Sequence, residues 1–340
     1  MTSRIHLPPP RGALSDHLLG ALRTSSSGSV HWIEPDDRED EQLSLWVLQE
    51  LSYRRLAGVD PAWEEQPSLL AVRHLLESGM EDRLRTELAV PHCEPEDLPG
   101  ALLALVDAGE GPSLSGWVLQ HGTLDHFREF VVHRAAYQLQ EADPHSFAIP
   151  RMAASPAKTA LLQLQLDEYG GAEPTEAHAL LFGRTMEALD LPPEADLDRL
   201  PAETLATNTL LSWFGRSRRL LPACLGHLAV FELTSVEPMA RYAAALRRLL
   251  PEASATEAAR FYAVHVAADG LHGTVALDRL LGGFAHDHPD ECDDVLFGAA
   301  ALMHVERRFA EHVVGAWERG ETSLRTPLPG SRFRVLRAVS

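Results

Sequence analysis

Cysteine is scarce in this sequence. Among 340 residues there are three cysteines, Cys93, Cys224 and Cys292, which lie far apart and in no paired spacing. This distribution argues against a disulfide framework and against a zinc site built from thiolates. It is typical of proteins in a reducing compartment, so we expect a cytoplasmic protein in which thiols do not ligate a metal.

Long apolar runs and clusters of basic residues are also missing. No uninterrupted apolar stretch approaches the length needed to span a bilayer, and no basic segment leads into an apolar run at the N-terminus. The formal net charge of −19 repels phosphate backbones and anionic lipids. We therefore expect neither nucleic acid nor a membrane as a partner. The expected partner is a small-molecule substrate, and a homodimer is left open.

Strand-like patterns are the third absence. The β-branched and aromatic residues never alternate at period two for long, whereas apolar residues recur at helical spacing in many segments, including residues 42–56 and 67–88. With 45% apolar residues the chain can bury a sizeable core. We predict an all-α fold in which residues 1–41 form a partly flexible N-terminal arm, 42–325 a single helical domain and 326–340 a C-terminal tail.

The most informative segment present is residues 261–272. It contains His265, Asp269 and His272, and steps of four and three residues place all three on one face of a helix. Imidazole and carboxylate groups are typical ligands of first-row transition metals. The alternative interpretation is two ordinary core or surface histidines near an exposed aspartate. A metal site would need further ligands from other helices.

Three residues on other predicted helices could supply them. Glu232 lies among apolar residues, where a buried carboxylate costs several kcal/mol unless a cation, a tyrosine, an arginine or a helix end compensates its charge. Glu168 and His178 lie on the two sides of the Gly170-Gly171 pair. Together the candidates provide three imidazoles and three carboxylates, a mixture that suits two iron or manganese ions bridged by a carboxylate: Glu168, His178, Glu232, His265, Asp269 and His272.

The common ferritin-like arrangement does not explain this set. That arrangement requires the pattern Glu-x-x-His on two helices. None of the 17 histidines has a glutamate three residues before it, and only His272 has an aspartate there, Asp269. A different helical scaffold is therefore expected.

The order of the candidates resembles the haem-oxygenase-like diiron oxidases and oxygenases, and more narrowly the bacterial iron-containing redox enzymes. Beside the candidate residues, the similar motifs are Gln-Glu-Ala-Asp-Pro-His at 140–145, Ala-Ile-Pro-Arg at 148–151, Asp-Glu-Tyr-Gly-Gly at 167–171 and Gly-His-Leu-Ala at 226–229. The resemblance covers roughly residues 42–325. It implies a haem-oxygenase-like seven-helix bundle, here with additional N-terminal helices.

The resemblance also implies a function. It predicts a non-haem diiron oxidoreductase with two Fe(II) ions and dioxygen as co-substrate, acting on a small amine, amino acid or fatty acid. The candidate residues carry over as metal ligands, with no other catalytic residue assigned. Whether Glu141 or His145 joins them is left open.

Three alternatives remain at this level. A haem-binding or haem-degrading protein on the same scaffold would need one axial histidine and no carboxylate cluster. A metal-free, thiaminase-like hydrolase would need a nucleophilic cysteine, for which Cys224 is the candidate. The third alternative is an inactive scaffold for protein interaction.

Overall fold

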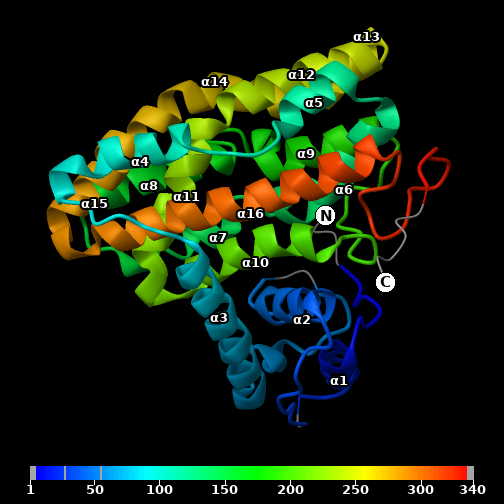
Figure 1. Ribbon diagram of the computed structural model, residues 1–340, viewed down its shortest axis with the longest axis horizontal. Helices are drawn as coiled ribbons and strands as arrows, with labels where there is room; N and C mark the ends of the chain where they lie inside the picture. Colours follow the sequence, from blue (N-terminus) through cyan, green and yellow to red (C-terminus); the bar gives the residue numbers. More distant parts are fainter. Residues whose placement is uncertain (1–4, 27, 54–55, 335–340) are drawn as a thin grey trace.

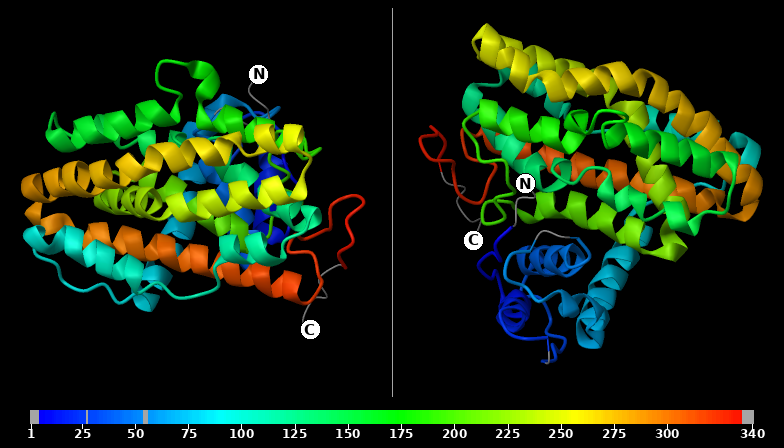
Figure 2. Two further views of the ribbon diagram at one scale, coloured as in Figure 1. Left: turned by 90° about the horizontal axis from the view of Figure 1, so that it is seen from above. Right: turned by 180° about the vertical axis from the view of Figure 1, so that it is seen from behind.

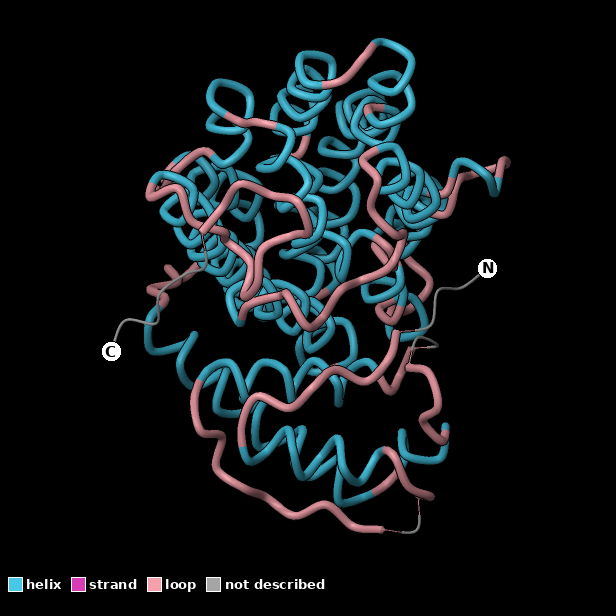
Figure 3. The backbone as a smooth tube through the Cα atoms, turned by 90° about the vertical axis from the view of Figure 1, so that its right-hand side faces the viewer, coloured by secondary structure: helices cyan, strands magenta, loops and turns pink. Residues whose placement is uncertain are grey.

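A computed structural model describes residues 5–26, 28–53 and 56–334, apart from the side chain of Asp269. Within these ranges the chain forms helices and loops, two isolated β-bridges and no strand (Figure 3). The predicted all-α class is confirmed.

The larger part of the molecule is a bundle of long helices that run beside one another (Figure 1). In the described ranges the α-helices are α1 (Ala13–Leu22), α2 (Arg38–Glu50), α3 (Pro67–Glu87), α4 (Leu98–Asp107), α5 (Leu114–His121), α6 (Leu124–Gln138), α7 (Asp143–Ser146), α8 (Pro156–Glu168), α9 (His178–Ala188), α10 (Ala202–Arg216), α11 (Leu221–Thr234), α12 (Val236–Leu249), α13 (Glu252–Ala258), α14 (Arg260–Thr274), α15 (Gly282–Asp287) and α16 (Cys292–Glu318). Short 3₁₀ turns lie between several of them, and α14 continues into α15 through the π-helix η6 (Val275–Leu281).

The N-terminal helices form a separate layer beneath the bundle (Figures 1 and 3). In this layer α2 packs against both α1 and α10. Residues 1–41, predicted as a partly flexible N-terminal arm, contain α1, whose Leu14, Leu18, Leu19 and Leu22 are fully buried. The arm and its boundary stay a prediction, but this segment does contribute to the core.

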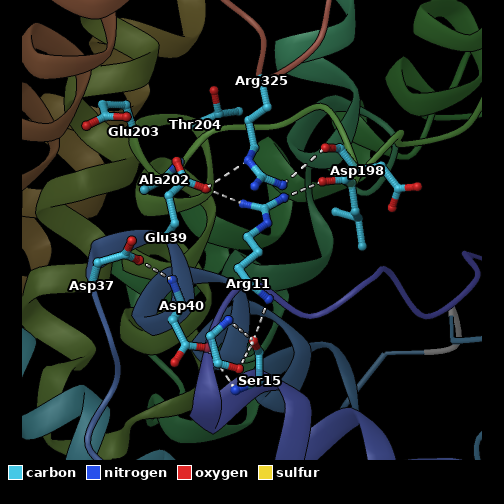
Figure 4. Close-up of polar contacts among 12 residues, drawn as sticks. Arg11, Ser15, Asp37, Glu39, Asp40, Asp198, Ala202, Glu203, Thr204 and Arg325 are labelled. Carbon is cyan, nitrogen blue, oxygen red and sulfur yellow. Dashed lines mark hydrogen bonds and ion pairs between the residues drawn. The ribbon is translucent and has the colours of Figure 1, made fainter. Parts of the chain in front are cut away.

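Polar contacts join this layer to later parts of the chain (Figure 4). The Arg11 guanidinium donates to the Glu39 carboxylate at 2.7 Å and to the backbone carbonyl of Leu197 at 2.5 Å. Arg325 lies 3.3 Å from the same Glu39 carboxylate. Burial lowers the pKa of Arg11 to about 10, so this guanidinium is still charged at neutral pH. The N-terminal layer is thus attached to segments far away in the sequence.

Two glycines allow the central helices α11 and α16 to pack closely. A Cβ at Gly226 of α11 would lie 2.0 Å from the carbonyl oxygen of Val295, and a Cβ at Gly298 of α16 would lie 2.0 Å from that of Ala223. Any side chain at these positions would force the two helices apart. This contact fixes α11, which carries Glu232, relative to the rest of the bundle.

In the part of the chain that the structure describes, no single helix is long and apolar enough to cross a membrane. The segments Arg218–Thr234 and Val236–Leu249 reach that length and composition only as a pair, bent by 50°.

Candidate metal centre

The candidate ligands lie where several helices begin, end or pass inside the bundle. Seen from behind in Figure 2, α14 runs along the same side of the molecule as α8 and α9. Glu168 is the last residue of α8, His178 is the first of α9, and Glu232 lies near the end of α11. Both His265 and His272 belong to α14.

The Gly170-Gly171 pair explains why Glu168 and His178 meet. Both glycines have positive φ, 92° and 58°, a conformation that residues with a Cβ rarely adopt. The turn also needs space, since a Cβ at Gly170 would lie 2.6 Å from the backbone nitrogen of Ala177. The glycines end α8 and let the chain fold back at once, so the next helix starts with His178 beside Glu168.

One group of buried side chains contains two carboxylates and two imidazoles: Glu141, Glu168, His178 and His265 offer donor atoms that all lie within 4.8 Å of one another. His178 Nδ1 lies 2.6 Å from Glu168 Oε2, and His265 Nε2 lies 3.3 Å from Glu141 Oε1. The ring centroids of the two histidines are 4.2 Å apart. Donor atoms bound to one ion lie at most about 4.4 Å apart, so the group is close to the spacing of a metal site.

A second group adjoins the first. Glu168, Glu232 and His272 also place donor atoms within 4.8 Å of one another, and His272 Nδ1 lies 3.4 Å from Glu232 Oε2. Glu168 belongs to both groups. A carboxylate shared in this way would be able to bind two ions, one from each group.

Hydrogen bonds behind two of the imidazoles fix which nitrogen faces the carboxylates. The Nδ1–H of His265 donates to the carbonyl of Phe261 at 2.9 Å, and its Nε2 faces Glu141. The Nε2–H of His272 donates to Asp167 at 2.9 Å, and its Nδ1 faces Glu232. Metal-bound histidines are usually held in this way.

The arrangement therefore fits a cation between each imidazole and its carboxylate. Two acceptor groups that face each other inside a protein repel, and a metal ion between them turns the repulsion into attraction. Nitrogen and carboxylate oxygen are donors that suit iron or manganese. The residues that are present thus match the chemistry of a two-metal site.

The surroundings of the two groups are short of positive charge. They border a cavity of about 60 Å³ in which no lysine or arginine is among the described lining residues. Burial, and then the charge of Glu168, raise the pKa of Glu141 above its usual range. Burial and the nearby Glu141, Glu168 and Glu232 carboxylates likewise raise the pKa of Tyr137 well above its ordinary value. Bound cations would compensate these carboxylate charges.

Of the six residues predicted from the sequence, the structure brings five together: Glu168, His178, Glu232, His265 and His272. The side chain of Asp269, the sixth, lies outside what the structure describes. His265 and His272 lie on one face of α14, but they belong to different groups of donors. The step of seven residues from one to the other separates them by about 10 Å along the helix.

The structure also shows what the sequence left open or missed. Glu141 joins the first group, whereas His145 belongs to neither group and lines the same small cavity. Asp167, which holds His272, was not predicted as a site residue. The sequence feature that points to Asp167 is weak, since it is merely a second acidic residue directly before Glu168 at the end of a predicted helix.

Comparison with curated proteins gives no match. A family model described as "Iron-containing redox enzyme" does match, over residues 128–307. The matched segment is more than half of the chain and contains both groups of candidate ligands. On this evidence, the chain belongs to the iron-containing redox enzyme family.

Proposed function

We propose that this protein is a non-haem diiron oxidase or oxygenase that activates dioxygen and acts on a small organic molecule. One Fe(II) ion would be bound by Glu141, Glu168, His178 and His265. The second would be bound by Glu168, Glu232 and His272, with Asp269 as the further ligand expected from the resemblance.

The observation that carries the proposal is the sharing of Glu168 by two groups of buried donors. Glu141 faces Nε2 of His265 and Glu232 faces Nδ1 of His272, and no lysine or arginine is among the described residues that line the adjoining cavity. Mixed imidazole and carboxylate donors of this kind suit metal ions such as iron.

The roles of the side chains follow from their contacts. Two adjacent ferrous ions, when bound, supply the electrons that reduce dioxygen. Glu168 would be a ligand of both ions, while Phe261 and Asp167 fix the ring orientations of His265 and His272. The small volume of the cavity excludes bulk water from the reacting groups.

The alternatives agree less well with the structure. A haem site needs no cluster of carboxylates, and the cavity of about 60 Å³ at the imidazoles is far below the roughly 300–1,000 Å³ typical of sites for larger organic ligands. For the thiaminase-like mechanism, Cys224 is buried, and burial raises its thiol pKa to about 12. A thiol of this kind is protonated at neutral pH and is a poor nucleophile.

Metal loading tests the proposal directly. Purified protein would be titrated with Fe(II) without oxygen, desalted and measured for iron, with two irons per chain expected. Mixing with oxygenated buffer should then consume oxygen and give a transient visible absorption. His178→Ala and His272→Ala should each lose iron and oxygen consumption.

A matched control is His286→Ala, because His286 is an exposed histidine outside the bundle interior. This variant should bind iron like the parent. A single tightly held zinc, a Soret band from haem, or full oxygen consumption by His272→Ala would each contradict the diiron assignment.

A further inference from the structure

A second, larger cavity adjoins the small cavity at the candidate metal centre. It has a volume of about 340 Å³, which lies within the range of small-molecule sites. It shares five lining residues with the small cavity at the carboxylates and imidazoles: Tyr137, Gln138, Phe231, Ser235 and Met239. We call the larger cavity the aromatic pocket and these five residues its neck.

Eight aromatic rings and two methionines are among the described residues that line the aromatic pocket. Besides the neck, it includes Phe130, Phe182, Tyr242, Phe261, Tyr262 and Phe309. Rings of this kind bind flat apolar molecules by stacked and edge contacts. The wall therefore favours a ligand with an aromatic body.

The charges of the side chains that line the aromatic pocket sum to zero. Its lining has two acids and two bases, Glu110, Glu306, Arg134 and Arg307. Arg134 donates two hydrogen bonds to Glu306, at 2.8 and 2.6 Å, and Arg307 pairs with Glu311 outside the pocket at 2.7 Å. Each guanidinium already has a carboxylate partner, and the two acids balance the two bases of the lining, so the pocket favours a ligand without net charge.

One polar group at the neck lacks a partner. Gln138 is 8% exposed, and its Oε1 forms no hydrogen bond with any residue that the structure describes. A buried amide oxygen without a partner is unfavourable, because it has lost its hydrogen bonds to water. Because Gln138 lines both cavities, a ligand that donates a hydrogen bond to it would satisfy this group and place its polar end toward the metal centre.

We propose that the aromatic pocket binds the substrate, and that the substrate is an uncharged aromatic molecule with an N–H or O–H group that donates to Gln138. The binding part of this inference stands on the pocket alone. Only the identification of the ligand as the substrate rests on the proposed diiron function.

The other large cavity is a less suitable substrate site. It has about 1100 Å³ and is lined by charged side chains that include Asp143, Arg184 and Glu187. Among the residues that the structure describes, it shares no lining residue with the small cavity at the metal centre. Tyr169, which donates to Asp143 at 2.8 Å, lies in its wall.

Calorimetric titration of the full chain without metal tests the binding part. The probes are indole, indene, which has the same shape without the N–H donor, and indole-5-carboxylate, which adds a charge. Indole should bind about 2–12-fold more tightly than indene, the range of one net hydrogen bond. The carboxylate should bind more weakly than indole.

Two variants locate this preference. Gln138→Leu should make indole and indene bind equally, with the affinity for indene retained as proof that the pocket is intact. The matched control is Gln165→Leu, because Gln165 is also a buried amide at the small cavity but does not line the aromatic pocket. It should preserve the preference of the parent.

Several results would overturn the inference: no binding of indole, tighter binding of the carboxylate, or an indole preference that survives Gln138→Leu. A different result would contradict the proposed diiron function alone. If indole binds as expected but the metal-free protein takes up no iron, the pocket stands and the diiron assignment is wrong.

Discussion

Two sets of buried histidines occupy the same helical bundle, and they differ in what they face. His178, His265 and His272 each lie next to a glutamate carboxylate. His145 and His227 instead face each other, with 3.2 Å between Nε2 of the first and Nδ1 of the second. The two sets are equally buried, so burial alone does not distinguish them.

The difference shows which observation identifies a metal ligand. Burial lowers the pKa of His145 to about 3 and that of His227 well below its ordinary value. Both rings are therefore neutral at neutral pH and can share a hydrogen bond without any cation. An imidazole beside a carboxylate instead forms a site that a proton or a metal ion can occupy. The facing group is thus more informative than the burial of the ring.

Removal of the shared carboxylate should have the largest effect. In Glu168→Ala both groups lose a donor, so we expect the iron content to fall from two per chain to less than one after anaerobic loading and desalting. His227→Leu removes a histidine of the other set and should keep two irons. Two irons in Glu168→Ala, counted by elemental analysis, would show that Glu168 is no ligand.

A smaller effect is expected from the residue behind His272. Asp167→Asn weakens the hydrogen bond to Nε2–H, and loss of such outer contacts typically costs about 10–100-fold in metal affinity. Competition with a chelator measures this change. Asp143→Asn is the matched control, since Asp143 accepts from Tyr169 and touches no candidate ligand ring. An Asp167→Asn protein with parental affinity would remove Asp167 from the site.

The histidines that face no carboxylate should appear in the pH dependence of stability. The pKa of His145 is about 3 in the folded protein and about 6.5 in an unfolded chain. The unfolded state therefore binds more protons between these values, so stability is fully present above about pH 6.5 and is lost as the pH falls toward 3.

Each such histidine contributes a slope of at most about 1.4 kcal/mol per pH unit in this window. Urea unfolding of the metal-free protein at several pH values should show a smaller slope for His145→Gln than for the parent. An unchanged slope would mean that His145 is accessible to protons in the folded state.

The smallest effect is expected at Cys224. Because burial raises its thiol pKa to about 12, the native protein should show no alkylation of this residue by iodoacetamide at pH 8, as measured by peptide mass spectrometry. Cys224→Ala should keep the iron content and oxygen consumption of the parent. Loss of oxygen consumption with intact iron binding would favour the thiol-dependent alternative.

The fold class and most of the candidate site could be predicted because they depend on short-range patterns. Helical spacing predicted the all-α fold, and the steps between His265 and His272 placed them on one helix face. The position of Glu232 among apolar residues suggested a buried charge that needs compensation. Each of these inferences uses neighbours along the chain.

The remaining parts depend on contacts between distant segments. The roles of Glu141 and Asp167 arise from where the ends of α6 and α8 meet α14, and no local pattern carries that information. The buried leucines of α1 were missed because flanking prolines and serines dominated the composition of the segment. The role of Gln138 becomes visible only from the shapes of the two cavities that it lines.

The turn at Gly170-Gly171 also has a consequence for how the centre assembles during folding. Glu168 and His178 are 10 residues apart, and a chain segment of that length closes in about 10–100 ns with a small entropic penalty. The contact of His265 with Glu141 and that of His272 with Asp167 form only when the chain closes loops of about 100 residues or more. One carboxylate and one imidazole can therefore meet long before α14 arrives, and the docking of α14 adds His265 and His272 to this pair.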